Sequence, residues 1–269
     1  MGSQKNFFYD YFDGQIIKEE TQNYKLFKVM LLCLFSLAGL FCVLMGFCNI
    51  AIFALLELGM IWNFYVKLNN PISVVFCVLV STIYFAIASF YMVYSHALIY
   101  MGFYIPFQMF ATTKTYYGGD FVQIRKEMND GSQIVFISLV FFASAVFYMF
   151  DYGFGSMFRV LDATSAACLV ASAVLRNERY KDYYYFRVIA LILSISLWIT
   201  VAVEFRNYSL LLIAAMYLSY LIFDVGTAIE QKLTYENEYM QIVKRYKEIE
   251  NKKVVDEKLK TYSKSKKSK

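Results

Sequence analysis

The sequence has few of the residues that interrupt helices or build common catalytic centres. It holds only two prolines, Pro71 and Pro106, and one histidine among 269 residues. No HExxH pair, Gly-rich phosphate loop or GxSxG elbow occurs, so the sequence does not indicate an enzyme of those classes. The five cysteines lie in or beside apolar runs without paired spacing, which favours neither a disulfide framework nor a zinc site.

Charge is also scarce, because charged residues make up 17% of the chain against 59% hydrophobic and 19% aromatic residues. A soluble domain is closer to half apolar. The apolar residues form runs of about 17–23 residues, each long enough to cross a ~30 Å hydrocarbon core as a helix. None shows the polar–apolar alternation of a transmembrane barrel. We therefore predict an all-α polytopic membrane protein with eight spans, at roughly residues 26–48, 50–66, 71–93, 97–112, 133–150, 157–175, 184–204 and 208–229.

Lysine and arginine are distributed unevenly among the segments that join these spans. One side of the membrane would receive Lys67, Lys114 and Arg176, together with the charged ends of the chain, and the other only Arg159 and Arg206. Because cytoplasmic segments carry the excess of Lys and Arg, both termini are predicted to be cytoplasmic. The predicted organisation is a cytoplasmic N-terminal segment over residues 1–25, a transmembrane domain over 26–230 and a basic cytoplasmic tail over 231–269.

The basic tail has two interpretations. Its lysines would attract it to an anionic inner leaflet, with membrane lipid as the partner. The alternative is a solvated tail without a specific partner. Neither interpretation involves nucleic acid.

The sequence also contains a weak internal repeat. Residues 67–108 align without gaps on residues 181–222, which places Tyr84 opposite Trp198. Two three-span units of the same orientation, joined by the span at 133–150, are typical of parallel-repeat transporters. We predict such a 3+1+3 core with an extra N-terminal helix.

Ionisable side chains within the spans are costly, so each is a functional hypothesis. Glu57 forms either an interhelical hydrogen bond or a contact with substrate. Asp162 lies about one turn from Arg159, a spacing that allows an ion pair on one helix face. Arg187 either extends toward the inner surface or faces the lumen. The single histidine, His96, falls between two spans and is predicted to lie in a short outer loop.

Motifs of a known family occur in the C-terminal half of the sequence. "NERYKDYYYFRVIALILSISLW" at 177–198 follows the pattern RYxxxW, then W, N, S-I and W, with matches that include Arg179 and Trp198. "LDATSAACLVASAVL" at 161–175 begins with the L-D-A-T of the same family.

Two further blocks lie N-terminal to these. "GGDFVQIRK" at 118–126 is similar to the family's basic D-V-x-x-R-K connector, and Tyr94, Pro106 and Gln108 have the spacing of its Y-G…P-M-Q segment. From about residue 58 to 230, the sequence therefore resembles the PnuC family of nicotinamide riboside transporters and its vitamin- and nucleoside-transporting relatives.

The resemblance implies a function as well as a fold. It implies facilitated diffusion of a small molecule into the cell for NAD biosynthesis or vitamin uptake, by a homotrimer in the plasma or inner membrane. Intracellular phosphorylation would maintain the gradient, and the chain contains no ATP-binding part and implies no cofactor. The alternative is a non-transporting membrane assembly or scaffold protein, whose polar residues only join helices.

The sequence departs from the family pattern at four pocket positions. Tyr184 and Arg187 stand where the family has tryptophans, and Val80 and Leu191 stand where it has asparagines, while Tyr84 is retained. Sites built on buried hydrogen bonds discriminate strongly between substrates. We therefore do not expect nicotinamide riboside to be bound as the family pattern implies. If Arg187 faces the lumen, the substrate is expected to be a related nucleoside, vitamin or anionic metabolite; if it faces lipid, the family pocket has been lost.

One apolar span contains both a helix-breaking residue, Pro106, and a side-chain amide, Gln108. Pro106 removes a backbone donor and predicts a kink. Gln108 would either form an interhelical hydrogen bond, with a stabilising free energy of about 0.6–2 kcal/mol, or be the substrate contact that the resemblance implies. The predicted substrate-binding residues are Gln108, Tyr84, Tyr184, Arg187, Asp162, Thr164 and Trp198.

Overall fold

The computed structural model describes residues 22–65, 71–110, 128–178, 180 and 182–226. The chain divides into two compact units, Met1–Phe223 and Asp224–Lys269. Nearly all of the described residues belong to the first unit. The candidate functional site also lies within this unit. The predicted tail at 231–269 and most of the predicted N-terminal segment lie outside the described residues.

Helix occurs at each of the eight predicted spans, and the described residues contain no strand. The elements are α2 (Gln22–Leu44), α3 (Ile50–Tyr65), α4 (Pro71–Phe90), α5 (Tyr94–Leu98) continuing into η1 (Ile99–Tyr104) and helical residues 105–110, α7 (Asp130–Gly153), α8 (Arg159–Asn177), α9 (Tyr183–Glu204), and η2 (Tyr208–Leu210) leading into a helix over 211–226. Five of the described helices are long and apolar enough to cross a membrane. The prediction of an all-α polytopic membrane protein is confirmed.

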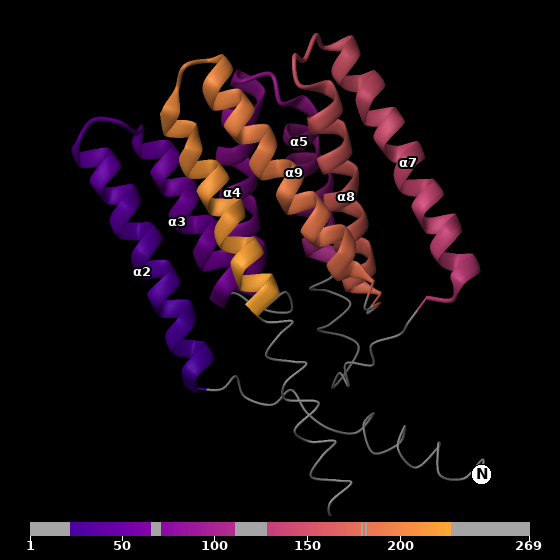
Figure 1. Cartoon of the computed structure of the whole chain (residues 1–269), viewed down its shortest axis with the longest axis horizontal. Helices are drawn as coiled ribbons and strands as arrows, with labels where there is room; N and C mark the ends of the chain where they lie inside the picture. The colour runs from indigo at the N-terminus through magenta and orange to yellow at the C-terminus, as the bar shows by residue number, and fades with distance from the viewer. Residues whose placement is uncertain (1–21, 66–70, 111–127, 179, 181, 227–269) are drawn as a thin grey trace, which may run out of the picture. The chain divides into compact units, whose positions relative to one another are not determined.

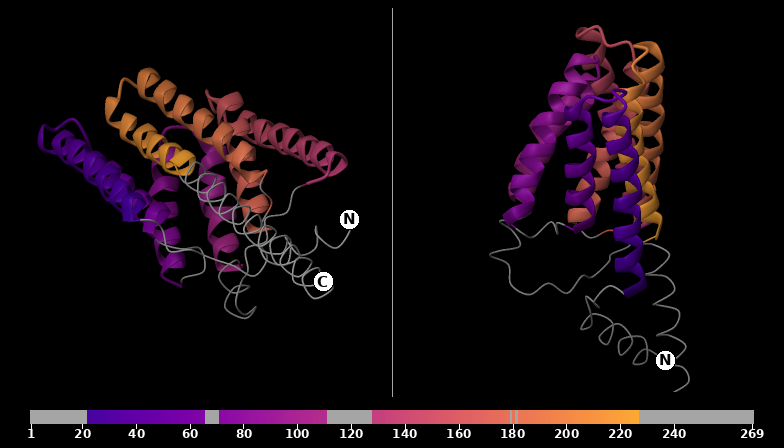
Figure 2. Two further views of the ribbon diagram at one scale, coloured as in Figure 1. Left: turned by 60° about the horizontal axis from the view of Figure 1, so that its bottom comes forward. Right: turned by 90° about the vertical axis from the view of Figure 1, so that its left-hand side faces the viewer.

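The long helices lie side by side, with α2 at one margin of the first unit and α7 at the other (Figures 1 and 2). The main hydrophobic core is formed by buried side chains of α3, α4, α5, η1, α9 and residues 210–220. In the apolar window of α7 no residue is buried within the chain. This helix therefore presents its apolar surface to lipid or to another protein chain.

Four helices end in the same backbone motif at one end of the unit (Figure 1). After each helix one residue adopts a left-handed conformation, with φ between 50° and 75°, at Gly46, Met92, Gly155 and Arg206. The N–H group of the following residue bonds back to a carbonyl five residues earlier, as in a Schellman motif. Each chain reversal is therefore short and tightly bonded.

Two of these turns match the predicted repeat. Val93 N donates to Ala88 O at 2.8 Å, and Asn207 N donates to Ala202 O at 3.0 Å. These positions are related by the offset of 114 residues that separates Tyr84 from Trp198. The same turn thus ends α4 and α9 at equivalent positions, which supports the repeat.

The extra N-terminal helix α2 packs on α3 through polar as well as apolar contacts. Ser36 Oγ donates a hydrogen bond of 2.8 Å to Glu57 Oε2, which confirms an interhelical hydrogen bond at Glu57. Lys28 Nζ donates to Phe64 O at 3.2 Å. Gly39 allows close packing, because a Cβ there would lie 2.8 Å from the Phe53 ring.

Candidate functional site

Four aromatic side chains form an aromatic cluster in the core, contributed by α4, η1, α9 and the last helix. The rings of Tyr84 and Tyr100 stack with centroids 3.9 Å apart. Trp198 and Tyr217 approach Tyr84 edge-on, with centroids at 5.7 Å and 6.3 Å. All four side chains are buried. The cluster thus joins elements from both halves of the repeat.

Hydrogen bonds within the aromatic cluster fix the orientation of its rings. Trp198 Nε1 donates to Tyr84 Oη at 2.8 Å, and the hydroxyl groups of Tyr100 and Tyr217 are 2.9 Å apart. Buried tyrosine and tryptophan side chains need such partners for their polar ends. Since Tyr84 and Trp198 occupy equivalent positions of the repeat, the first bond joins the two halves directly.

The helix that begins with α5 changes its winding just before Pro106. Residues Ile99–Tyr104 form a π-helix, and α-helix resumes at Ile105. A proline lacks the backbone donor that its preceding turn needs, and π turns often occur at functional sites. The irregularity predicted at Pro106 thus takes the form of a widened turn, which carries Tyr100 and Tyr104. Gln108 lies one turn further on and is 3% exposed.

Arg187 of α9 turns toward the tyrosines of the neighbouring helices. Its guanidinium carbon lies 5.9 Å from the centre of the Tyr220 ring. Tyr184, one turn earlier, is half-buried, with its ring 4.0 Å from that of Tyr183. The positions of the missing family asparagines, Val80 and Leu191, are buried in the same core.

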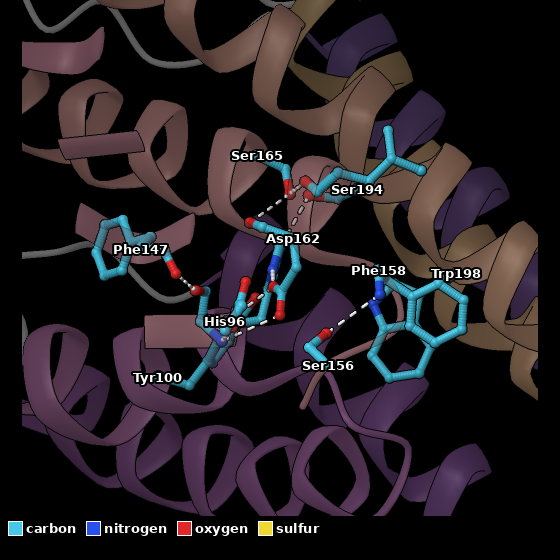
Figure 3. Close-up of polar contacts among 12 residues, drawn as sticks. His96, Tyr100, Phe147, Ser156, Phe158, Asp162, Ser165, Ser194 and Trp198 are labelled. Atoms are coloured by element: carbon cyan, nitrogen blue, oxygen red, sulfur yellow. Dashed lines mark hydrogen bonds and ion pairs between the residues drawn. The ribbon is translucent and has the colours of Figure 1, made fainter. Parts of the chain in front are cut away.

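A polar cluster of Ser95, His96, Asp151, Asp162 and Ser194 lies around the start of α5. His96 Nδ1 is 2.6 Å from Asp162 Oδ1, and His96 Nε2 is 3.2 Å from Ser194 Oγ. Figure 3 shows the His96 ring beside Asp162 and Ser194. The cluster therefore connects α5 to α8 and α9.

The two aspartates of the polar cluster also bind backbone groups of α5. The Ser95 N–H group lies 3.0 Å from Asp151 Oδ1 and 3.0 Å from Asp162 Oδ2. The His96 N–H group donates to Asp162 Oδ1 at 3.0 Å. First-turn N–H groups have no partner inside their own helix, and here buried carboxyl groups satisfy them.

Two predictions about this region are wrong. His96 is fully buried rather than placed in an outer loop, because the chain reverses at Met92 and helix begins again at Tyr94. The ion pair between Asp162 and Arg159 does not form: Arg159 Nε instead donates to Ser156 O at 2.7 Å. Its guanidinium also covers the Tyr152 ring at 4.7 Å. Asp162 faces α5, where the N–H groups of Ser95 and the His96 ring are its partners.

The predicted site residues fall into different places. Tyr84 and Trp198 meet in the aromatic cluster, whereas Asp162 belongs to the polar cluster. Thr164 lies two residues further along α8, about 200° around the helix from Asp162, and is half-buried. Residues of both clusters that were not predicted are Tyr100, Tyr217, Ser95, His96, Asp151 and Ser194. The described residues contain no group of three or more His, Cys, Asp or Glu side chains arranged to hold a metal ion.

Comparison with solved proteins finds a similar fold. The helical arrangement is that of a multi-pass membrane protein. It is similar to the crystal structure of the vitamin B3 transporter PnuC, with a TM-score of 0.58 and 17% sequence identity over 77% of this chain and 89% of that chain. At this identity the likeness shows the fold alone, and it confirms the fold that the sequence resemblance implies. The sequence matches no protein-family model and no curated protein.

The hydrogen bond between Trp198 and Tyr84 can be tested with a single substitution. Tyr84→Phe keeps the ring but leaves the buried Trp198 Nε1–H group without its acceptor, which we expect to cost about 1–3 kcal/mol. The melting temperature in detergent should fall. Because the chain has two tryptophans, a Trp62→Phe background makes Trp198 the only one, and its emission should shift.

The matched control is Tyr185→Phe, which removes the same hydroxyl group from a side chain of α9 that is 71% exposed. This variant should melt like the parent protein. Equal melting temperatures for Tyr84→Phe and Tyr185→Phe would contradict the hydrogen bond.

Proposed function

We propose that the protein carries a small ring-containing metabolite across the membrane by facilitated diffusion. The substrate is nicotinamide riboside or a related compound such as a nucleoside or vitamin. The observation that supports this most directly is the aromatic cluster, in which the two repeat halves meet in a chain with a transporter fold. Flat aromatic faces are suited to stacking on a heterocyclic ring.

The proposed site extends from the aromatic cluster along α9 and the helix after η1. Arg187 supplies a guanidinium for a phosphate or carboxylate, since its guanidinium carbon lies 5.9 Å from the centre of the Tyr220 ring on the last helix. Gln108 supplies an amide from a buried position. The residues proposed to bind substrate are Gln108, Tyr84, Tyr184, Arg187, Asp162, Thr164 and Trp198.

Several properties of the protein follow from this proposal. The protein would act in the plasma or inner membrane as a non-enzymatic carrier without a cofactor, with both termini in the cytoplasm and a role in NAD biosynthesis or vitamin uptake. We also propose a homotrimer. The apolar window of α7, in which no residue is buried within the chain, is consistent with packing against lipid or a second copy of the chain.

One observation favours the alternative of a non-transporting assembly protein. The hydroxyl groups of Tyr84, Tyr100 and Tyr217 and the indole of Trp198 already bond to one another. A cluster that satisfies its own polar groups can serve purely to join helices. Transport therefore requires these bonds to rearrange when a solute binds.

Uptake into proteoliposomes separates the two functions. Purified protein is reconstituted and tested with labelled nicotinamide riboside, nucleosides, thiamine and riboflavin. Gln108→Ala should lower uptake roughly tenfold, as expected for one lost hydrogen bond of ~1.4 kcal/mol, without preventing insertion. Gln133→Ala, which removes the same amide from the half-buried first turn of α7, should transport normally. If no member of the panel enters, the assembly function is favoured.

Arg187 is expected to select for anionic solutes. Arg187→Leu should reduce the uptake of solutes with a carboxylate or phosphate by roughly 10- to 100-fold, because it removes a charged hydrogen bond. Uptake of neutral solutes should change less. Arg187→Lys keeps the charge without the planar fork and should give intermediate rates. Unchanged uptake of every solute by Arg187→Leu would exclude a role for this residue in the site.

A further inference from the structure

Two aspartates from neighbouring helices, Asp151 of α7 and Asp162 of α8, converge on one N–H group. Each places a carboxyl oxygen 3.0 Å from Ser95 N. The two oxygens therefore lie at most 6.0 Å apart, since each is 3.0 Å from the same nitrogen, and both side chains are 0% exposed. Carboxylates that share a buried site cannot both be ionised at low cost, so such a pair retains a proton.

The second oxygen of Asp151 points to the same conclusion. Within the part of the chain that the structure describes, no N–H or O–H group donates a hydrogen bond to Asp151 Oδ2. A buried carboxylate oxygen without a donor is costly. A proton held between Asp151 and Asp162 removes this cost, because one carboxyl group then donates to the other.

Charged and titratable groups from several helices surround the pair. The basic partner is His96, whose ring bonds to Asp162 and, on its other side, to Ser194 of α9. From α4 and the last helix, Tyr84 and Tyr217 face the His96 ring, with centroids at 6.2 Å and 6.5 Å.

Two further side chains complete these surroundings. Tyr100 of η1 stacks on Tyr84, and tyrosine hydroxyl groups are uncharged near neutral pH. Arg159, in the first turn of α8, is bound to Ser156 O and the Tyr152 ring. One imidazole therefore faces two carboxyl groups, and a further proton is needed to balance their charge.

The position of Asp151 gives the proton a short path to the surface. Asp151 lies two residues before the end of α7, and the residues that follow, 152–155, are exposed. In the Schellman turn at Gly155, Ser156 N donates to the Asp151 backbone carbonyl at 2.9 Å.

We propose that Asp151 and Asp162 form a proton-binding site, with His96 as the balancing base, and that its ligand is one exchangeable proton. Loss of the proton would leave two repelling carboxylates around Ser95 N–H and loosen the start of α5. Because α5 continues directly into η1, the change reaches Tyr100 in the aromatic cluster. The effect on transport rests on the proposed function, whereas proton binding does not.

Infrared spectroscopy of the full chain in liposomes tests proton binding without any solute. Difference spectra between acidic and alkaline buffers should contain the C=O stretching band of a protonated carboxylic acid. The band should be lost in Asp151→Asn and in Asp162→Asn, and retained in Asp130→Asn, which changes the exposed first residue of α7. Absence of the band from the parent protein, or its persistence in both cluster variants, would overturn the proposal.

Trp198 emission tests the link to the aromatic cluster. In the Trp62→Phe background, emission should change with pH, and Asp151→Asn should abolish this change, since asparagine is an isosteric side chain that does not titrate. Varying Na⁺ at constant pH should leave emission unaltered. Emission that is independent of pH would overturn the link, and a response to Na⁺ that requires Asp151 would show that the ligand is a metal cation rather than a proton.

Discussion

The hydrogen bond between His96 and Asp162 is the interaction on which the interior of the helical unit depends. It is a short contact of 2.6 Å between fully buried groups. Asp162 also binds the first N–H groups of α5, so this one carboxyl group fixes where the helix begins. Removing one partner from a buried charged pair typically costs about 3–5 kcal/mol. Since α5 runs into η1, the polar cluster thereby positions Tyr100 against Tyr84.

The internal repeat supplies the second half of this arrangement. Tyr84 and Trp198 occupy equivalent positions and bond directly to each other. Near the equivalent turns, Asn207 Nδ2 donates to Tyr91 Oη at 2.6 Å. The two halves therefore meet both at their turns and within the aromatic cluster. If transport moved the two halves relative to each other, these contacts would have to change. The proposed substrate site includes one of them, the contact between Tyr84 and Trp198.

The sequence predicts the helices well, because long apolar runs are a strong signal. It also indicates Tyr84 and Trp198, through the repeat and the family resemblance. It does not reveal His96, because the residue falls in a short break between spans and its partner is 66 residues away. Nothing distinguishes Tyr100 and Tyr217 among 24 tyrosines, and their contact depends on the π turn and on helix packing.

Nuclear magnetic resonance of the imidazole group tests the polar cluster most directly. His96 is the only histidine, so protein labelled with ¹⁵N-histidine in lipid gives signals from this ring alone. We predict an Nδ1–H proton that resonates far downfield and exchanges slowly with water, because it is buried in a short hydrogen bond to Asp162, and that is lost in Asp162→Asn. A rapidly exchanging imidazole, typical of an exposed loop and unchanged by Asp162→Asn, would contradict the account.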